Sequence, residues 1–391
     1  MNLKLLEQEV QDFIKQNTGN DITKLALQKN PFGNIEWAEI LNQIAARTKA
    51  KDKLPTWYNT DSILYPSKVS VEQTSSEVAA HYKSSLISGK KLIDLTGGFG
   101  IDDYYFSQQV EQVTHTELNA ELSAIAAHNF KTLATENITA ITGDSIDILQ
   151  RLDEKWDWIY ADPARRSDTK GKVFMLKDCL PNVPELLDSY FNYTDNILIK
   201  TAPLLDISAG MGELHSVKEI HIVAIQNEVK ELLWVLQKEF KGIPTVHSVN
   251  ILKDSKSIFT SLLDDSNEAQ ISMPENYLYE PNSAVMKSGA FNQIGKSYNV
   301  GKLHRHTHLY TSENLVEFPG RVFKINKILP YQKSEMKEYV QGKKMNITVR
   351  NFPLSVPEIA KKWKVKDGGD TYAFFATNMH NAKIVLLCKK A

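Results

Sequence analysis

The sequence has few cysteines, no long apolar run and almost no net charge. Its 391 residues include only two cysteines, Cys179 and Cys388, which excludes a disulfide framework and a cysteine-rich zinc site and suits a reducing compartment. No apolar stretch approaches the roughly 18 residues that span a bilayer. The first residues, MNLKLLEQEV, lack the apolar core of a signal peptide. We therefore expect a cytoplasmic protein with no membrane contact, no metal and no obligate protein partner.

The net charge of −1 hides an uneven distribution of charged residues. Residues 301–391 contain 17 lysines and arginines but only 7 acidic residues, so the preceding 300 residues are acidic. A basic C-terminal quarter indicates a polyanionic partner, although a solvated lysine-rich surface has the same composition.

The spacing of apolar residues divides the chain into four predicted domains. Residues 1–66 have helical periodicity, and LPTWYNTDSILYPSK, with two prolines, is typical of a linker. A helix is expected from Thr74 or Ser75 as N-cap, with Glu77 completing a capping box. Residues 67–242 alternate strands with helices, which predicts a doubly wound α/β sheet. Strands are expected at 91–95, 112–116, 138–142, 157–161, 196–200, 219–225 and 230–236, and helices near 102–109, 119–134, 145–151 and 177–191.

The short connection between the last two predicted strands fixes their relative direction. Only QNEV separates the last two predicted strands, which is too short for a crossover helix, so they must be antiparallel. Residues 243–318 mix short apolar runs with polar turns, and the pattern of residues 319–391 predicts a small α+β domain. The expected architecture is thus a Rossmann-like seven-stranded sheet with an antiparallel last hairpin, an N-terminal helical region and small C-terminal domains.

A glycine-rich turn, KKLIDLTGGFGID, follows the first predicted strand. The dinucleotide fingerprint G-x-G-x-x-G would need a third glycine where Asp103 stands, so a nicotinamide cofactor is disfavoured. The alternative template is an acid followed by small residues at every second position, which forms an open turn beneath the methionine part of S-adenosylmethionine. A tight turn without a ligand is the structural alternative. The candidate cofactor residues in this turn are Asp94, Thr96, Gly98 and Gly100.

Acids also end the second and third predicted strands. Glu117 is placed to accept both hydroxyls of a ribose. Asp144 could accept a hydrogen bond from an adenine amino group, with Ser145 capping the next helix. Each acid alone could be a helix cap, but three at successive strand ends favour S-adenosylmethionine.

The fourth predicted strand ends in ADPARR. In enzymes that methylate amino groups on bases, a D/N-P-P-aromatic turn here accepts hydrogen bonds from the amine and orients its lone pair. Asp162 and Pro163 match this turn, whereas Ala164 and Arg165 replace its second proline and its aromatic residue. Arg165 or Arg166 could instead bind a phosphate, although a surface salt bridge is an equal alternative for Arg166.

Two other groups of residues could carry chemistry. Cys179 could be a nucleophile, but a predicted helical position without a base partner favours a buried structural thiol. The segment KLHRHTHLY alternates like a strand, and its histidines lack cysteine or acid ligands at useful spacing, which favours a basic surface over a metal site. These histidines are His304, His306 and His308.

The motifs DLTGGFGIDD, HTELNAELSAIAAHN, GDS and ADPARR together resemble those of class I methyltransferases. VSVEQTSSEVAAHYKSSL is similar to the helix before the glycine turn in RNA cap guanosine methyltransferases. The segments from YLYEPNSAVMKSGAF to FPGRVFKI and from GKKMNITVRNF to TYAFFATN resemble the ferredoxin-like and THUMP-like domains of a bacterial methyltransferase family. The resemblance covers residues 67–391 and implies four parts: 1–66 helical, 67–242 methyltransferase, 243–318 ferredoxin-like and 319–391 THUMP-like.

The resemblance implies RNA as the substrate, because THUMP domains occur in RNA-modifying enzymes. The expected function is S-adenosylmethionine-dependent methylation of RNA, with the exocyclic amino group of a purine as the first candidate acceptor. Methylation of a protein or small molecule is one alternative. A nonenzymatic RNA-binding protein with a degenerate methyltransferase domain is another, suggested by the D-P-A-R turn.

Overall fold

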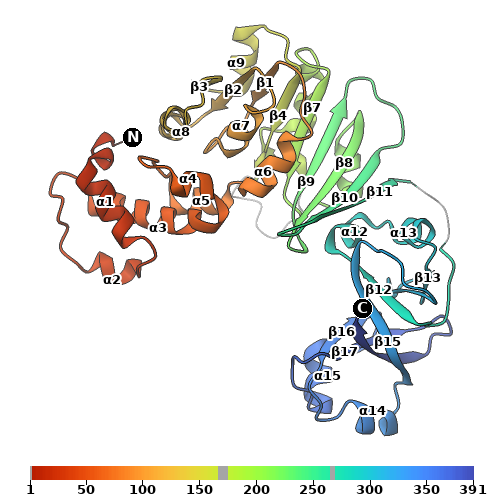
Figure 1. Ribbon diagram of the computed structural model, residues 1–391. Helices are drawn as coiled ribbons and strands as arrows, with labels where there is room; N and C mark the ends of the chain where they lie inside the picture. The colour runs from red at the N-terminus through yellow and green to blue at the C-terminus, as the bar shows by residue number, and fades with distance from the viewer. Residues whose placement is uncertain (1, 166–174, 265–268) are drawn as a thin grey trace. The chain divides into compact units, whose positions relative to one another are not determined.

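The computed structural model describes residues 2–165, 175–264 and 269–391. Its contacts group the chain into two compact units (Figure 1). The first comprises residues 1–218 and 231–242, and the second comprises residues 219–230 and 243–391. The four-part layout expected from the sequence stays a prediction. No helix in the described ranges has both the length and the apolar character needed to cross a membrane.

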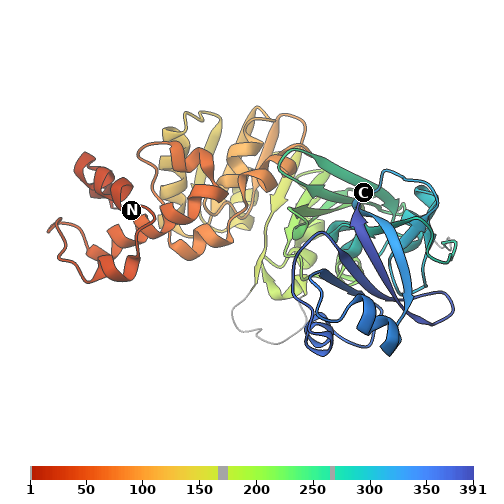
Figure 2. The same cartoon turned by 60° about the horizontal axis from the view of Figure 1, so that its bottom comes forward.

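The first unit begins with a group of short helices in which α1 and α2 pack against α3 (Figure 2). The predicted linker is wrong, because this segment contains a helix and is buried: Leu54 and Trp57 are inaccessible to solvent, and Gln43 hydrogen-bonds both backbone groups of Tyr65. The helices are η1 Leu3–Leu6, α1 Gln8–Asn17, α2 Ile22–Ala26, α3 Trp37–Lys53, α4 Pro55–Asn59, α5 Lys68–Gln73 and α6 Glu77–Ser84.

The capping prediction for α6 is also wrong. Its N-cap is Ser76, whose side chain accepts a hydrogen bond from the Ala79 backbone. The Glu77 carboxylate binds the Thr56 backbone and hydroxyl and the Tyr105 hydroxyl instead. Glu77 therefore joins α4, α6 and α7 (Ile101–Phe106), because a buried carboxylate takes whichever donors lie nearest.

Strands lie at all seven places predicted for the α/β sheet. They are β1 Lys91–Asp94, β2 Gln112–Glu117, β3 Ile138–Thr142, β4 Trp158–Ala161, β7 Asn196–Thr201, β8 Val217–Ile225 and β9 Glu228–Gln237. The helices that follow β1 to β7 are α7 Ile101–Phe106, α8 Ala120–Thr132, α9 Ser145–Leu152, α10 Val183–Tyr190 and α11 Ile207–Glu213. β3, β2, β1, β4 and β7 are parallel neighbours in that order, and β9 is antiparallel to β7.

The sheet extends beyond the seven predicted strands: it has nine strands in the order β11-β10-β8-β9-β7-β4-β1-β2-β3. The additional strands are β10 Thr245–Ile251, parallel to β8, and β11 Lys256–Leu262, antiparallel to β10. β8 turns into β9 through Gln226 and Asn227, both at positive φ as in a two-residue hairpin. Local sequence predicted the strands at 219–225 and 230–236 but could not show which partner covers the free edge of β8.

The predicted helix 177–191 begins later than expected. Residues before Pro181 form η2 Leu176–Asp178 and the short strand β6 Cys179–Leu180, which pairs with β5 Ala164–Arg165. Helix α10 starts at Val183, with a proline in its first turn. Pro181 interrupts the apolar periodicity at this point, because a proline cannot continue a helix from the preceding residues.

The second unit contains a seven-stranded sheet in the order β13-β14-β12-β15-β18-β17-β16. Phe374 on β17 packs in a core on one face, and Phe375 packs in a second core on the other, with Met336 of α14 and Trp363 of α15. The strands are β12 Tyr277–Pro281, β13 Gly301–Lys302, β14 Tyr310–Ser312, β15 Gly320–Pro330, β16 Asn346–Arg350, β17 Tyr372–Thr377 and β18 Lys383–Lys390. The helices are α12 Ser283–Ser288, α13 Phe291–Ser297, α14 Lys333–Tyr339 and α15 Val356–Trp363.

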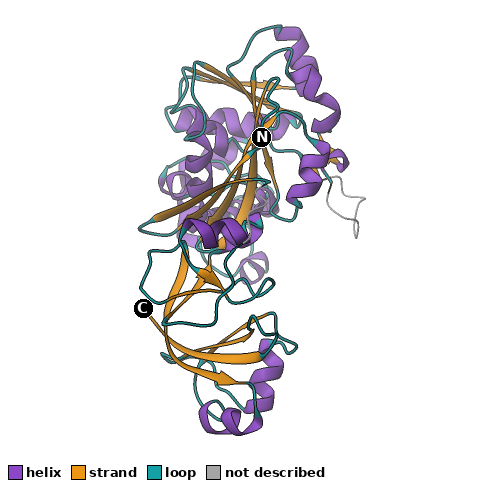
Figure 3. Cartoon of the chain, turned by 90° about the vertical axis from the view of Figure 1, so that its right-hand side faces the viewer, coloured by secondary structure: helices purple, strands orange, loops and turns teal. Residues whose placement is uncertain are grey.

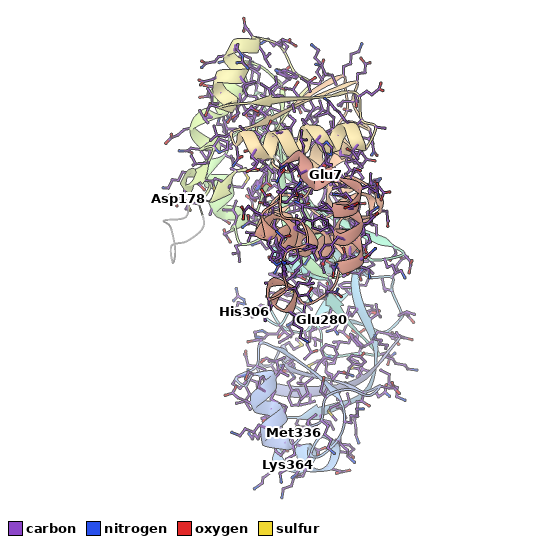
Figure 4. The ribbon with its side chains drawn as sticks, turned by 90° about the vertical axis from the view of Figure 1, so that its left-hand side faces the viewer. Glu7, Asp178, Glu280, His306, Met336 and Lys364 are labelled. Carbon is purple, nitrogen blue, oxygen red and sulfur yellow. The ribbon has the colours of Figure 1, made fainter. Side chains whose placement is uncertain are left out.

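Helices α14 and α15 lie together beside strands of this second sheet (Figure 3). Figure 4 labels Met336 in α14 and Lys364 at the end of α15. The α15 N-terminus has a complete capping box between Ser355 and Glu358, which satisfies two backbone donors that the helix leaves free.

Candidate functional site

The glycine turn after β1 depends on the absence of side chains. Gly98 and Gly100 have φ angles of +58° and +82°, a region that glycine adopts without strain. A Cβ at Gly97 would lie 2.2 Å from the His115 ring, so this glycine, which the sequence analysis did not single out, permits close packing on β2. Among the described residues, a Cβ at Gly98 would meet only the Thr96 carbonyl oxygen, at 3.6 Å. The turn therefore leaves space above Gly98 where a ligand can approach the backbone.

Thr96 links the tip of β1 to the turn after β4. The carboxylate of Asp94 accepts hydrogen bonds from the Thr96 N–H at 2.7 Å and from its hydroxyl at 3.0 Å. The Thr96 hydroxyl oxygen in turn accepts the Asp162 N–H at 2.7 Å. Two residues predicted as cofactor contacts thus also fix the position of the predicted catalytic turn.

A buried acid–histidine cluster lies beneath the glycine turn. His115 Nδ1 lies 2.7 Å from Asp103 Oδ2, and both side chains are inaccessible to solvent. Burial and the Asp103 carboxyl raise the pKa of Asp94 well above its usual range, and burial and Asp102 do the same to the pKa of Asp103. Burial lowers the pKa of His115 despite the neighbouring acids. Asp103, which replaces the third glycine of the dinucleotide motif, is therefore a packing residue under the turn.

Glu117 closes the turn from the neighbouring strand. Its Oε2 accepts the Gly98 N–H at 2.9 Å, and its Oε1 accepts the Asn119 N–H at 2.8 Å. Each carboxylate oxygen has a second lone pair. The side chain is therefore held in place while still able to accept further hydrogen bonds at the end of β2.

The predicted roles of Asp144 and Ser145 need one correction. Asp144 itself is the N-cap of α9, with Oδ1 accepting the N–H groups of Ile146 and Asp147. Ser145 is the first helical residue, so the prediction that it caps the helix is wrong. Aspartate is among the best N-cap residues. A contact between Asp144 and an adenine stays a prediction.

Asp162 forms an ion pair that the sequence analysis missed. Its Oδ2 lies 2.5 Å from Nζ of Lys200 at the end of β7, the strand that neighbours β4. Burial lowers the pKa of Lys200, but the carboxylates of Asp162, Glu231 and Asp102 more than offset this and raise it overall. Lys200 is thus a fixed cation beside the predicted catalytic carboxylate. The signal available in the sequence was a lysine at the end of an otherwise apolar strand.

A second lysine, Lys83, is fully buried and pairs with two carboxylates near the glycine turn. Lys83 Nζ lies 3.0 Å from Glu231 Oε2, 3.1 Å from Asp102 Oδ1 and 2.7 Å from the Ser75 hydroxyl. The Lys83 side chain has no exposed surface, and that of Glu231 is 3% exposed. Tyr160 of β4 donates its hydroxyl to Asp102 at 2.8 Å. This Lys83 network connects the region before the glycine turn to α7, β4 and β9.

The second half of the D-P-A-R turn forms a short β-strand. Pro163 is buried and Ala164 is exposed. Ala164 and Arg165 form β5 and pair with β6, so the turn differs from an open D-P-P-aromatic loop. The predicted phosphate contact of Arg166 lies outside the described residues. Cys179, opposite Arg165, is fully buried, as expected for a structural thiol, but in a strand where we predicted a helix.

The predicted histidine strand is a loop. His304, His306 and His308 lie between β13 and β14. The His308 ring stacks on Phe291 with 3.6 Å between centroids, and burial together with Lys302 lowers its pKa to about 4. His308 is thus a neutral packing residue near pH 7. His306, labelled in Figure 4, is exposed.

Comparison with known proteins gives a match over nearly the full chain. A proposed methyltransferase from Porphyromonas gingivalis W83 is 32% identical in sequence, with a TM-score of 0.87 over 99% of this chain and 98% of the other. An rRNA methylase from Streptococcus thermophilus matches 41% of this chain and 94% of its own, at 13% identity and a TM-score of 0.30. A Streptococcus mutans protein, SMU.1697c, solved with S-adenosylhomocysteine, matches 40% and 94% at 10% identity and a TM-score of 0.30. No curated protein matches the chain.

Two family models match the second unit. Residues 277–319 match a ferredoxin-like domain, and residues 320–390 match a THUMP domain-like model. These assignments fit the C-terminal resemblance seen in the sequence. The match to the Porphyromonas gingivalis protein also covers the first unit. The chain belongs to the bacterial family of class I methyltransferases that carry a C-terminal THUMP-like domain.

Proposed function

We propose that the protein binds S-adenosylmethionine across the tips of β1, β2 and β3 and transfers its methyl group to RNA. S-adenosylmethionine supplies an electrophilic methyl group on a positively charged sulfur. The observation that supports this proposal most directly is the open space above Gly98, with the Glu117 carboxylate held beside it. Carboxylates suit the ammonium and ribose hydroxyl groups of the cofactor.

In this proposal Asp162 receives the acceptor group. Lys200 occupies Oδ2 of Asp162, which leaves Oδ1 to accept a hydrogen bond from an exocyclic amine. Pro163, Ala164 and Arg165 would shape the turn, and a backbone carbonyl could accept the second amine hydrogen. Such positioning directs the nitrogen lone pair at the methyl group and can account for much of the rate.

RNA is proposed as the substrate because the second unit has a lysine-lined groove. The groove has a volume of about 640 Å³ and includes Lys324, Lys389 and Lys390. Lys324 lies directly opposite Lys389 in the antiparallel β15–β18 pair. Like charges at this position destabilise a sheet. A phosphate bound beside Lys324 and Lys389 would offset this repulsion. The THUMP domain-like match over residues 320–390 supports the same substrate class.

The proposal is tested by methyl transfer to RNA. Total RNA from cells that lack the gene is incubated with purified protein and isotopically labelled S-adenosylmethionine, digested to nucleosides and analysed by mass spectrometry. We expect one labelled purine nucleoside with the methyl group on its exocyclic nitrogen. Parallel incubations with cell protein and with small metabolites should remain unlabelled. Label only in one of those two would exclude RNA as the substrate, and RNA binding without transfer would support the nonenzymatic alternative.

Glu117→Ala is expected to weaken cofactor binding about 10- to 100-fold, because a hydrogen bond to a charged group contributes about 1.5–3 kcal/mol. Glu117→Gln retains one acceptor oxygen and should have an intermediate effect. Isothermal titration calorimetry with S-adenosylhomocysteine measures the affinity directly. Glu136→Ala, at an exposed position, is the matched control. Undiminished affinity in Glu117→Ala would remove this carboxylate from the proposed site.

A further inference from the structure

Two neighbouring strands of the second unit bring a carboxylate and two imidazoles together. β8 and β10 are parallel, with His221 opposite His247 and Glu219 opposite Thr245. Side chains two residues apart on a strand share a face, so Glu219 and His221 project from β8 on the same side as His247 from β10. The sequence places Glu219 and His247 far apart, which is why their spacing gave no ligand pattern.

The distances between these groups suit a small divalent cation. Glu219 Oε2 lies 3.2 Å from His221 Nε2 and 3.6 Å from His247 Nε2, and the three potential ligand atoms all lie within 4.8 Å of one another. Ligands at about 2.0–2.2 Å from a tetrahedral zinc ion are about 3.4 Å apart. Two of the separations are therefore already close to those of a zinc site.

One ring is also oriented from its far side. His247 Nδ1 lies 3.1 Å from the Thr260 hydroxyl on β11. Hydrogen bonding at Nδ1 fixes a histidine ring and leaves Nε2 for a metal. The two imidazoles are stacked, with centroids 4.5 Å apart and planes at 17°. Metal capture requires them to turn so that both Nε2 lone pairs meet at one point beside Glu219.

Solvent can reach this group of side chains. His221 is buried, with 5% of its side chain exposed, whereas the side chains of Glu219 and His247 are 30% and 23% exposed. An ion could therefore enter from the side of Glu219 and His247, with water as the fourth ligand. Three protein ligands and one water are typical of a zinc site that is not fully enclosed.

We propose that Glu219, His221 and His247 form a zinc site that joins β8 to β10. Imidazole and carboxylate ligands of this kind bind Zn²⁺ and also Co²⁺, which can serve as a spectroscopic substitute. The site is outside the proposed methyl-transfer site and does not depend on its chemistry. Because zinc would bind the folded strands and not the unfolded chain, its binding also raises the stability of this unit.

The test uses full-length protein purified without a polyhistidine tag, stripped with a chelator and then dialysed. We expect titration calorimetry with zinc chloride and elemental analysis to give one zinc per chain. Cobalt substitution should give the absorption bands of a tetrahedral Co²⁺ site. His247→Ala and Glu219→Gln are expected to abolish stoichiometric binding, and zinc should raise the melting temperature of the wild type but not of these variants.

The matched control is the double variant His304→Ala/His306→Ala, because these two histidines are also neighbours, with ring centroids 5.6 Å apart. The control should retain one zinc per chain. Circular dichroism of the zinc-free proteins shows whether each variant is folded. The proposal is wrong if the wild type binds no stoichiometric zinc, or if binding is lost in the control and kept in His247→Ala.

Discussion

Asp162→Ala is expected to reduce methyl transfer at least about 100-fold while leaving the affinity for S-adenosylmethionine unchanged. Loss of one well-placed electrostatic contact in a transition state has an effect of this size. The substitution keeps the backbone N–H that donates to Thr96, so the turn should stay in place. What is lost is the side-chain oxygen that accepts the hydrogen bond of the amine, together with the ion pair to Lys200.

Single-turnover kinetics with labelled cofactor measure this loss, and calorimetry measures the affinity. Asp147→Ala, on the exposed side of α9, controls for removing a carboxylate near the sheet. Lys200→Met should also slow transfer, because it frees Oδ2 of Asp162 and changes the orientation of the carboxylate. If Asp162→Ala retains full turnover, Asp162 does not receive the acceptor and the proposed reaction centre is misplaced.

The sequence predicted those parts of the fold that depend on local pattern. Apolar runs ending in Asp94, Glu117 and Asp162 located strand ends, because parallel strands place their carboxyl ends at one edge of a sheet. The pattern could not show that β10 extends this sheet, since an apolar strand of seven residues fits either a separate domain or the edge of β8. Strand partners are decided by tertiary packing.

The same limit applies to side chains whose role depends on distant partners. A lysine is most often a surface residue, and nothing near Lys83 in the sequence indicates a partner at Glu231. The contact between them spans 148 positions. Thr96 was predicted to line the cofactor, but its link to Asp162 became visible only when β1 and β4 were adjacent. The strand tips were therefore predictable, whereas the ion pairs that organise them were not.

Lys83→Met is expected to destabilise the first unit by about 3–5 kcal/mol, because removing one partner of a buried ion pair leaves the other charge buried and unpaired. Here the remaining charges are Glu231, which is almost inaccessible, and Asp102. Asp102 keeps hydrogen bonds from Ser75 and Tyr160, so the larger part of the cost arises at Glu231. Equilibrium urea unfolding followed by circular dichroism measures the change in free energy.

The double variant Lys83→Met/Glu231→Gln separates this electrostatic cost from lost packing. Removing the unpaired charge of Glu231 should recover a substantial part of the stability. The double variant should therefore unfold at a higher urea concentration than Lys83→Met alone. Lys15→Met is the surface control: Lys15 pairs with Asp61 at 2.7 Å, but the Asp61 side chain is 77% exposed, and such pairs contribute about 0–1 kcal/mol. If Lys83→Met destabilises the protein no more than Lys15→Met does, the Lys83 network does not stabilise the first unit. Its ion pairs would then have another role, such as setting the charge around Asp102.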